Sequence, residues 1–299
     1  MFMIKLNIFI FIFLFATISL AQENGFKEEV LTQGNFDNRY ASYNKAGEHI
    51  IFESNRDGRW QIYIMDVNGN SQRRLITSDA NDRRPSWNDL RNEIIFESDR
   101  NGYTDIYIYN LNSKSLSKVP ISFKGNKTHA QFAPNGAEII FNYKVRDNNY
   151  NIYRCNLKGK RLKKLIDNAY KNVYPRFTSK GDAIVYYSGK HTKGEDDEIY
   201  AYNIILKKEA RLSNWPTDNR YPDWSNNDNK IAYATEMEDG SSEIYTMTKF
   251  GKSNIRITYN EYDDILPTWS PQDFNLLISS KRNGYFQIVR ILLKEALGE

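Results

Sequence analysis

Cysteine is almost absent from this sequence, because Cys155 is the only one among 299 residues. An intramolecular disulfide is therefore excluded, and the fold must be held by a buried core, for which the chain is long enough. Cys155 lies in the strand-like segment Ile152-Tyr153-Arg154-Cys155. A small buried side chain is the ordinary interpretation there, and a catalytic thiol is the less favoured one.

Basic runs and catalytic motifs are missing as well. The 41 Lys and Arg residues are interspersed with 37 Asp and Glu residues, for a formal net charge of +4. Nucleic acid is therefore not an expected partner. The sequence has no Gly-x-Ser-x-Gly elbow, no phosphate-binding glycine-rich loop and no cysteine-based metal spacing. Its three histidines are His49, His129 and His191, and only the last two are expected on one face, too few for a metal site without other ligands. The sequence favours a protein that is not an enzyme and holds no cofactor or metal.

Residues 1–21 differ from the rest of the chain. Lys5 is their only charge, Ile8 to Ala16 are apolar, and small residues precede Gln22. This pattern predicts a signal peptide that is removed before Gln22, and thus a periplasmic or secreted protein with no membrane span after cleavage. The alternative is an uncleaved anchor, but the apolar run is shorter than the ~20 residues that a spanning helix needs.

An internal repeat dominates the remaining sequence. An Ile-Tyr pair starts at residues 62, 106, 152, 199 and 244, and Ile288-Val289 is a sixth copy, at steps of 44 to 47 residues. An aromatic residue keeps the same period at Tyr43, Trp87, Phe132, Phe177, Trp224 and Trp269. Each unit shows four short strand patterns separated by turn signals such as Asp57-Gly58. Four-stranded units of about 45 residues are typical of β-propeller blades.

The sequence therefore predicts an all-β, six-bladed propeller of four-stranded antiparallel blades. It forms one domain over residues 22–299, with blades at about residues 37–81, 82–125, 126–170, 171–217, 218–263 and 264–293. The repeated aromatic residues are expected to pack between blades; a ligand-stacking surface is the alternative. We expect the domain to be monomeric.

The sixth blade lacks its fourth strand. In the other blades an apolar residue follows the Ile of the Ile-Tyr pair by 13 positions, as Leu75 follows Ile62, but 13 positions after Ile288 the chain has ended. The missing pattern occurs at the other end, in Val30-Leu31-Thr32. We therefore expect residues of about 27–33 to complete the last blade and close the ring.

The repeat motifs resemble the WD40-like repeats of TolB-type propellers. The resemblance rests on Tyr221-Pro222-Asp223-Trp224-Ser225, Ala133-Pro134-Asn135-Gly136, Ser54-Asn55-Arg56-Asp57-Gly58 and Ile62-Tyr63-Ile64-Met65-Asp66. It implies a periplasmic or secreted bacterial protein that receives a protein partner on one face of the ring, in TolB itself a peptidoglycan-associated lipoprotein. TolB carries an α/β domain before its propeller. Here fewer than ten residues separate the expected cleavage site from the closing strand, so we expect that domain to be absent.

Departures from the repeat indicate where a partner binds. His129 replaces the usual Pro or Tyr at the start of blade three, and the second hairpins of blades three and four depart in sequence and length from the others. Since strand direction alternates, these features are expected on one face, although tolerated surface insertions would look the same. The candidate binding residues are His129, Arg146, Asn148, Tyr150, His191, Lys193, Glu195, Asp196 and Asp197.

Two functions from different classes fit the sequence. The favoured one is an exported, non-enzymatic scaffold that binds a protein of the cell envelope. The other is a glycan-binding or glycan-cleaving propeller that uses carboxylates such as Asp196 and aromatic side chains such as Tyr150. The Arg residues of the hairpins, Arg56, Arg100 and Arg282, recur at one repeat position and are interpreted as structural, with an anion-binding ring as the alternative.

Overall fold

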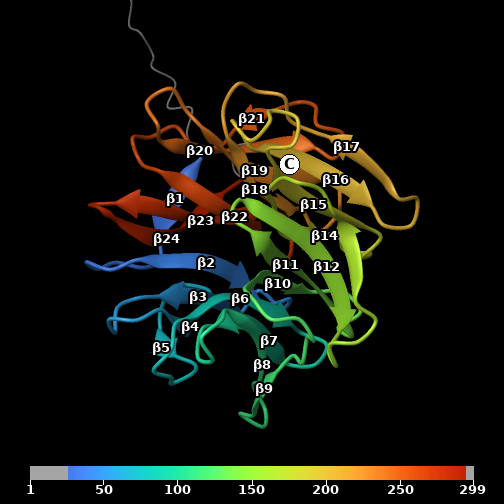
Figure 1. Ribbon diagram of the computed structural model, residues 1–299. Helices are drawn as coiled ribbons and strands as arrows, with labels where there is room; N and C mark the ends of the chain where they lie inside the picture. The colour runs from blue at the N-terminus through green and yellow to red at the C-terminus, as the bar shows by residue number, and fades with distance from the viewer. Residues whose placement is uncertain (1–25, 294–299) are drawn as a thin grey trace, which may run out of the picture.

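Every regular element of residues 26–293, the part of the chain that this computed structural model describes, is a β-strand. The 24 strands form six four-stranded antiparallel sheets that follow one another around a ring (Figure 1). The predicted six-bladed propeller is confirmed. Residues 1–21, the predicted signal peptide, lie outside the described part.

In the first five blades the strands run from the inner to the outer one in chain order, and in blade six the outer strand is β1. Blades one to three comprise β2 (Asn38–Tyr43), β3 (His49–Ser54), β4 (Gln61–Asp66), β5 (Arg73–Arg74); β6 (Asp82–Asn88), β7 (Glu93–Ser98), β8 (Asp105–Asn110), β9 (Leu116–Lys118); and β10 (Lys127–Phe132), β11 (Glu138–Arg146), β12 (Asn149–Asn156), β13 (Lys163–Ile166). Blades four to six comprise β14 (Asn172–Phe177), β15 (Ala183–Ser188), β16 (Glu198–Asn203), β17 (Lys208–Arg211); β18 (Asn219–Trp224), β19 (Lys230–Glu236), β20 (Ser242–Thr248), β21 (Ile255–Arg256); and β22 (Asp264–Trp269), β23 (Asn275–Arg282), β24 (Tyr285–Leu292), β1 (Lys27–Val30).

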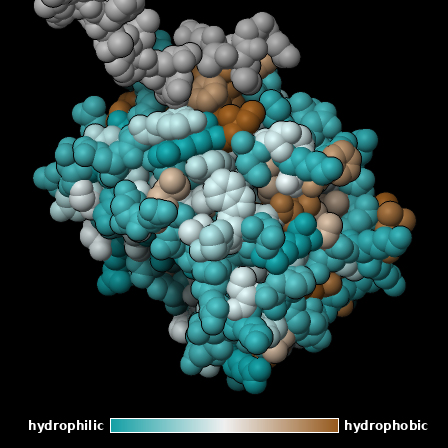
Figure 2. Space-filling model, turned by 90° about the horizontal axis from the view of Figure 1, so that it is seen from above, coloured by the Kyte–Doolittle hydropathy of each residue, from teal (hydrophilic) through white to brown (hydrophobic). Residues whose placement is uncertain are grey.

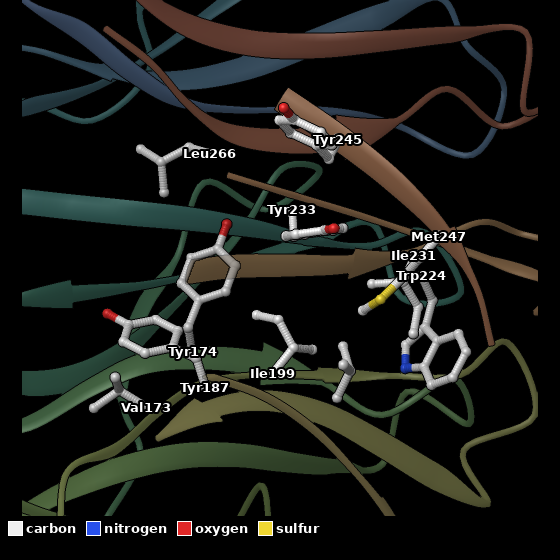
Figure 3. Close-up of a cluster of buried hydrophobic side chains, with 11 residues drawn as sticks. Val173, Tyr174, Tyr187, Ile199, Trp224, Ile231, Tyr233, Tyr245, Met247 and Leu266 are labelled. Atoms are coloured by element: carbon white, nitrogen blue, oxygen red, sulfur yellow. The ribbon is translucent and has the colours of Figure 1, made fainter. Parts of the chain in front are cut away.

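The core lies between the blades. The second strand of a blade is apolar at consecutive positions, and in β3 the side chains of Ile50, Ile51 and Phe52 are all fully buried. Such a strand is buried on both faces because a neighbouring blade covers each one. Figure 3 shows one of these interfaces, in which Ile199 of blade four packs with Trp224 of blade five.

The repeated aromatic residues belong to these interfaces, as expected. The indole nitrogen of Trp87 donates to the backbone carbonyl of Ser42 in the preceding blade at 3.0 Å. Trp269 makes the same bond to Asp223 at 3.2 Å. These rings therefore join blades.

The N-terminal strand closes the ring, as predicted. β1 pairs antiparallel with β24, from Lys27 opposite Leu292 to Val30 opposite Val289. The next residue, Leu31, donates its backbone N–H to Ile288 at 2.8 Å, which is the bond that Leu75 makes to Ile62 in blade one. In Figure 1 the blue β1 lies beside the red β24.

One glycine shows how tightly the closing segment is held. Gly69 follows β4 with a φ of +82°, and a Cβ atom on it would lie 2.6 Å from the carbonyl oxygen of Leu31. Gly251 approaches Leu212 in the same way, at 2.3 Å. Because only glycine tolerates both the conformation and the contact, Leu31 occupies the place of a fourth-strand residue.

The surface seen in Figure 2 is mainly hydrophilic, with hydrophobic side chains in small separate patches. Within residues 26–293 there is no helix of the length and hydrophobicity needed to cross a membrane.

Candidate functional site

The inner strands share an irregularity that places side chains in the central channel. Their register with the second strand shifts near the third residue, and that residue has a φ between +51° and +60°. The six residues are Tyr40, Arg84, His129, Tyr174, Tyr221 and Leu266. A non-glycine residue with such a φ is uncommon, so the same strained conformation in every blade is part of the architecture.

Side chains of this layer meet across the axis. Tyr40 of blade one lies 6.3 Å from the ring of His129 in blade three and 6.4 Å from that of Tyr174 in blade four. His129 and Tyr174 are 5.7 Å apart. Residues from non-adjacent blades touch only in the middle of the ring, so the channel is filled at this level.

His129, which is half-buried, was expected on the same face of the ring as the two hairpins. The structure places it in this inner layer, where its Nδ1 atom lies 3.1 Å from the hydroxyl of Thr128. Burial, with the charges of Arg84 and Arg176 nearby, lowers the pKa of His129 well below its ordinary value. The imidazole is thus neutral at physiological pH. Within residues 26–293, no three His, Cys, Asp or Glu side chains are grouped so as to hold a metal ion.

The second hairpin of blade three is longer than its equivalents in blades one and two. β11 and β12 stay paired out to Arg146 and Asn149, and the exposed turn between them includes Asn148 at a φ of 55°. Tyr150 is half-buried and forms an isolated parallel bridge with Lys171, at the start of blade four. The hairpin therefore carries two exposed candidate residues and is fixed at its base.

The corresponding loop of blade four combines exposed and anchored residues. Lys193 and Glu195 are exposed, whereas Asp196 is half-buried and bonds through its backbone N–H to Thr192. The ring of His191, although exposed overall, stacks on Tyr200 at 5.6 Å, and its Nδ1 atom lies 2.6 Å from that hydroxyl. His191 and His129 are therefore in different environments.

Asp197 is buried and links blades four and five. Its carboxylate accepts from Lys171 Nζ and Arg220 Nε, each at 2.6 Å. Since Tyr150 pairs with Lys171, the bases of both hairpins belong to one network that also reaches blade five. The structure thus brings Tyr150 and Asp197 together, and leaves Arg146, Asn148, Lys193 and Glu195 exposed beyond them.

The recurrent arginines bind within their own blades. Arg100 Nη2 contacts both carboxylate oxygens of Asp82, at 2.8 and 3.0 Å. Arg56 Nη2 donates to the Asn38 side chain at 2.9 Å. Arg282 pairs with Glu28 of the closing strand. These contacts agree with the structural interpretation.

Beyond the filled layer the channel is hollow. A cavity of about 200 Å³ reaches Ser42, Gln131, Arg176 and Asp223, and a wider one of about 590 Å³ continues to the turns between first and second strands. Arg176 lies over the ring of Tyr174 at 4.1 Å and 3.7 Å from Asp223. Burial raises the pKa of Asp223 to about 6. This opening is on the face opposite the candidate hairpins.

One polar cavity on the hairpin face was missed by the sequence analysis. Its volume is about 380 Å³, and its lining includes Trp60, Arg83, Arg84 and Glu97. Glu97 is only 2% exposed and accepts from Arg84 Nη1 at 2.6 Å. A usable signal was present, since a glutamate stands in the otherwise apolar strand Ile94-Ile95-Phe96 and again after Phe52. A charged residue in a strand buried on both faces needs a specific partner.

Comparison with known proteins gives one family and several similar structures. The TolB beta propeller domain family matches residues 17–145 and 142–296. TolB from Acinetobacter baumannii is 19% identical, with a TM-score of 0.66, over 86% of this chain and 63% of that one. A protein assigned as TolB from Agrobacterium tumefaciens is 14% identical, with a TM-score of 0.71, over 88% and 93% of the two chains. An oligogalacturonate lyase in complex with manganese is 12% identical, with a TM-score of 0.64, over 93% and 96%. At these identities the structural likeness shows the fold alone, and the chain spans less than two thirds of the Acinetobacter protein.

Proposed function

Because the chain belongs to the TolB beta propeller domain family, we propose that it is an exported, non-enzymatic scaffold that binds a protein partner in the periplasm or cell envelope. Export depends on residues 1–21, with cleavage before Gln22. The binding surface is the face that carries the second hairpins of blades three and four. A peptidoglycan-associated lipoprotein is the first partner to test, on the resemblance to TolB.

One observation carries the choice of this face. The bases of both hairpins are fixed by the network of Tyr150, Lys171, Asp197 and Arg220, while their ends are exposed. A hairpin whose base is already fixed loses little backbone entropy when a partner binds. In many proteins the binding residues lie on loops that a rigid scaffold positions in this way.

Glycan cleavage has less support. The Asp197 carboxylate is buried and already paired with Lys171 Nζ and Arg220 Nε, so it is not free to approach a sugar. The similarity to the lyase concerns the fold, and a fold supports many activities.

The test is a capture experiment with matched variants. Arg146→Ala, Lys193→Ala and Glu195→Ala are combined in one protein, since all three side chains are exposed. The control carries Lys45→Ala and Lys180→Ala in the exposed turns of the opposite face. Purified peptidoglycan-associated lipoprotein and cross-linked envelope extracts serve as partner sources, with mass spectrometry as the readout.

We expect the hairpin variant to lose at least tenfold in affinity and the control to bind normally, with the melting temperature of both within about 2 °C of the wild type, as surface substitutions rarely change stability by more than about 0.5 kcal/mol. Loss of binding in the control, with normal binding by the hairpin variant, would place the site on the opposite face. Absence of any specific partner would reject the scaffold function.

A further inference from the structure

Two buried glutamates occupy equivalent positions in blades one and two. Glu53 in β3 is opposite Arg39 of its inner strand, and Glu97 in β7 is opposite Arg83. Glu53 is fully buried and Glu97 is 2% exposed. Both approach the inner strand of the next blade: Glu53 Oε2 accepts from the Arg84 backbone N–H at 2.8 Å, and Glu97 Oε1 lies 3.4 Å from that of His129.

Their side-chain partners differ. Arg83 of the next blade donates to Glu53 at 3.1 Å, and Arg39 of the same blade lies 3.6 Å away. Glu97 pairs with Arg84 of its own blade. Its second oxygen, Oε2, is buried and has no hydrogen-bond partner among the described residues. A carboxylate accepts about four hydrogen bonds, and a buried acceptor left without one costs ~1–3 kcal/mol.

Two substitutions in the repeat account for this difference. In the antiparallel ladder of blade two Arg83 lies opposite Glu97, and in that of blade three Thr128 lies opposite Asn142. Thr128 therefore occupies in blade three the position that Arg83 occupies in blade two. Thr104 occupies the position of Trp60, since each donates its backbone N–H to an asparagine that precedes an inner strand. Around Glu53 the guanidinium of Arg83 lies 4.6 Å from the ring of Trp60. Around Glu97 both large side chains are replaced by threonine.

The cavity described above adjoins this position. Its volume is about 380 Å³, and Glu97, Thr104, Asp99 and Trp60 are among its lining residues. Its lining holds two guanidinium groups and two carboxylates, whose charges balance. The lining therefore has no net positive charge that would repel a further cation. Burial raises the pKa of Glu97 above its ordinary value despite the charges of Arg84 and Arg83. A cationic donor at Oε2 would offset that cost.

We infer that this cavity receives a guanidinium group, an arginine side chain of the protein partner, which donates to Glu97 Oε2 as Arg83 donates to Glu53. The inference rests on the proposed function, because the cavity lies on the same face as the hairpins of blades three and four. The contact of Arg83 with Glu53, between blades two and one, is the template for the proposed contact with Glu97. Guanidinium suits the site because its planar set of donors pairs with a carboxylate.

A small probe tests the inference without the partner. N-acetyl-arginine amide is titrated into the purified protein, with N-acetyl-citrulline amide as its uncharged isostere, and the indole N–H signal of Trp60 is followed by NMR. The signal is assigned with Trp60→Phe. We expect saturable binding of the arginine derivative, at least tenfold tighter than the citrulline derivative.

Two variants make the result specific. Glu97→Gln should remove the preference for arginine, whereas Glu48→Gln, an exposed glutamate in a turn of the opposite face, should keep it. Thr128→Arg should supply the missing guanidinium from within, raise the melting temperature and abolish probe binding. Equal affinity for the two probes, unchanged arginine binding by Glu97→Gln, or unchanged binding by Thr128→Arg would each overturn the inference. Probe binding with no partner capture would reject the proposed function and leave the guanidinium site standing.

Discussion

The closing strand is where a short deletion should affect the whole ring. A variant that begins at Gly34 loses β1 together with Leu31 and Thr32. It leaves β24 as an unpaired edge, and exposed edges recruit other chains. It also opens the interface of blades six and one, where Leu31 packs with Ile50 and Ile288.

The magnitude follows from the packing and hydrogen bonds that the deletion removes. Leu31 is 8% exposed, and removal of a buried leucine side chain costs about 2–5 kcal/mol. Thr32 Oγ1 accepts the buried N–H of Ile288 at 2.8 Å and donates to Gln287 at 3.0 Å, and loss of these partners costs about 1–3 kcal/mol. The β1 ladder adds little, because hydrogen bonds worth ~1 kcal/mol each are offset by ~1–2 kcal/mol for ordering each residue. Val30, which is 38% exposed, contributes less than its apolar side chain suggests.

The total is about 3–8 kcal/mol, a large part of the ~5–15 kcal/mol that stabilises a typical protein. At about 2–4 °C for each kcal/mol in a chain of this size, the melting temperature should fall by at least about 6 °C. Calorimetry and size-exclusion chromatography measure the fall and the accompanying aggregation. Leu31→Ala should reproduce part of the effect, and Lys27→Gln, at the exposed start of β1, should not. A truncated chain that stays monomeric and melts within about 2 °C of the intact one would refute the closure argument.

Three other predictions concern processing, metal content and pH. The exported protein should begin at Gln22, which N-terminal mass spectrometry checks; a membrane-held chain that retains residues 1–21 would contradict it. Elemental analysis should find no stoichiometric transition metal, before or after His129→Ala, because within residues 26–293 no group of metal-ligating side chains includes this imidazole; metal that is lost with the substitution would contradict this. Burial raises the pKa of Asp264 to about 6 from an unfolded value of 3.8. Ionisation of Asp264 therefore lowers the free energy of unfolding above pH 6, and protonation restores it as the pH falls. In urea unfolding, the free energy of unfolding of the wild type should rise by about 1.4 kcal/mol relative to that of Asp264→Asn when the pH is lowered from 7.5 to 5. Parallel pH profiles of the two proteins would refute this.

The sequence predicted the ring because two independent landmarks carry the same period. The Ile-Tyr pairs mark the third strand, and the aromatic residues mark the end of the first strand. Closure could also be predicted, because the interval from Ile62 to Leu75 has no counterpart after Ile288 and the missing pattern occurs at Leu31. These predictions depend on the alternation of apolar and polar residues and on the intervals between repeated motifs, both of which a single sequence shows.

The position of His129 could not be predicted in the same way. Whether a residue at the start of an inner strand faces the loops or the axis depends on a register shift, and the six shifted positions hold Tyr, Arg, His and Leu. None of these residue types signals a positive φ. Asp197 presented a second difficulty, since its partners Lys171 and Arg220 lie 26 and 23 residues away, at the start of its own blade and in the next blade. A loop sequence alone gives no indication that this carboxylate is buried.

Departures from the repeat are informative once the structure supplies the equivalences between blades. Glu97 and Glu53 occupy the same sequence context and the same register, so each serves as a control for the other. Around Glu53 the arginine and tryptophan of the repeat are both present, and every oxygen of the carboxylate has a donor. Around Glu97 two threonines leave a cavity and an acceptor without a donor among the described residues. A blade that only had to pack would fill such a space or replace the glutamate, because an unpaired buried carboxylate is costly. The cavity and the unpaired oxygen of Glu97 occur together, on the face that carries the irregular hairpins. Their coincidence is the physical reason to look for a ligand in this cavity.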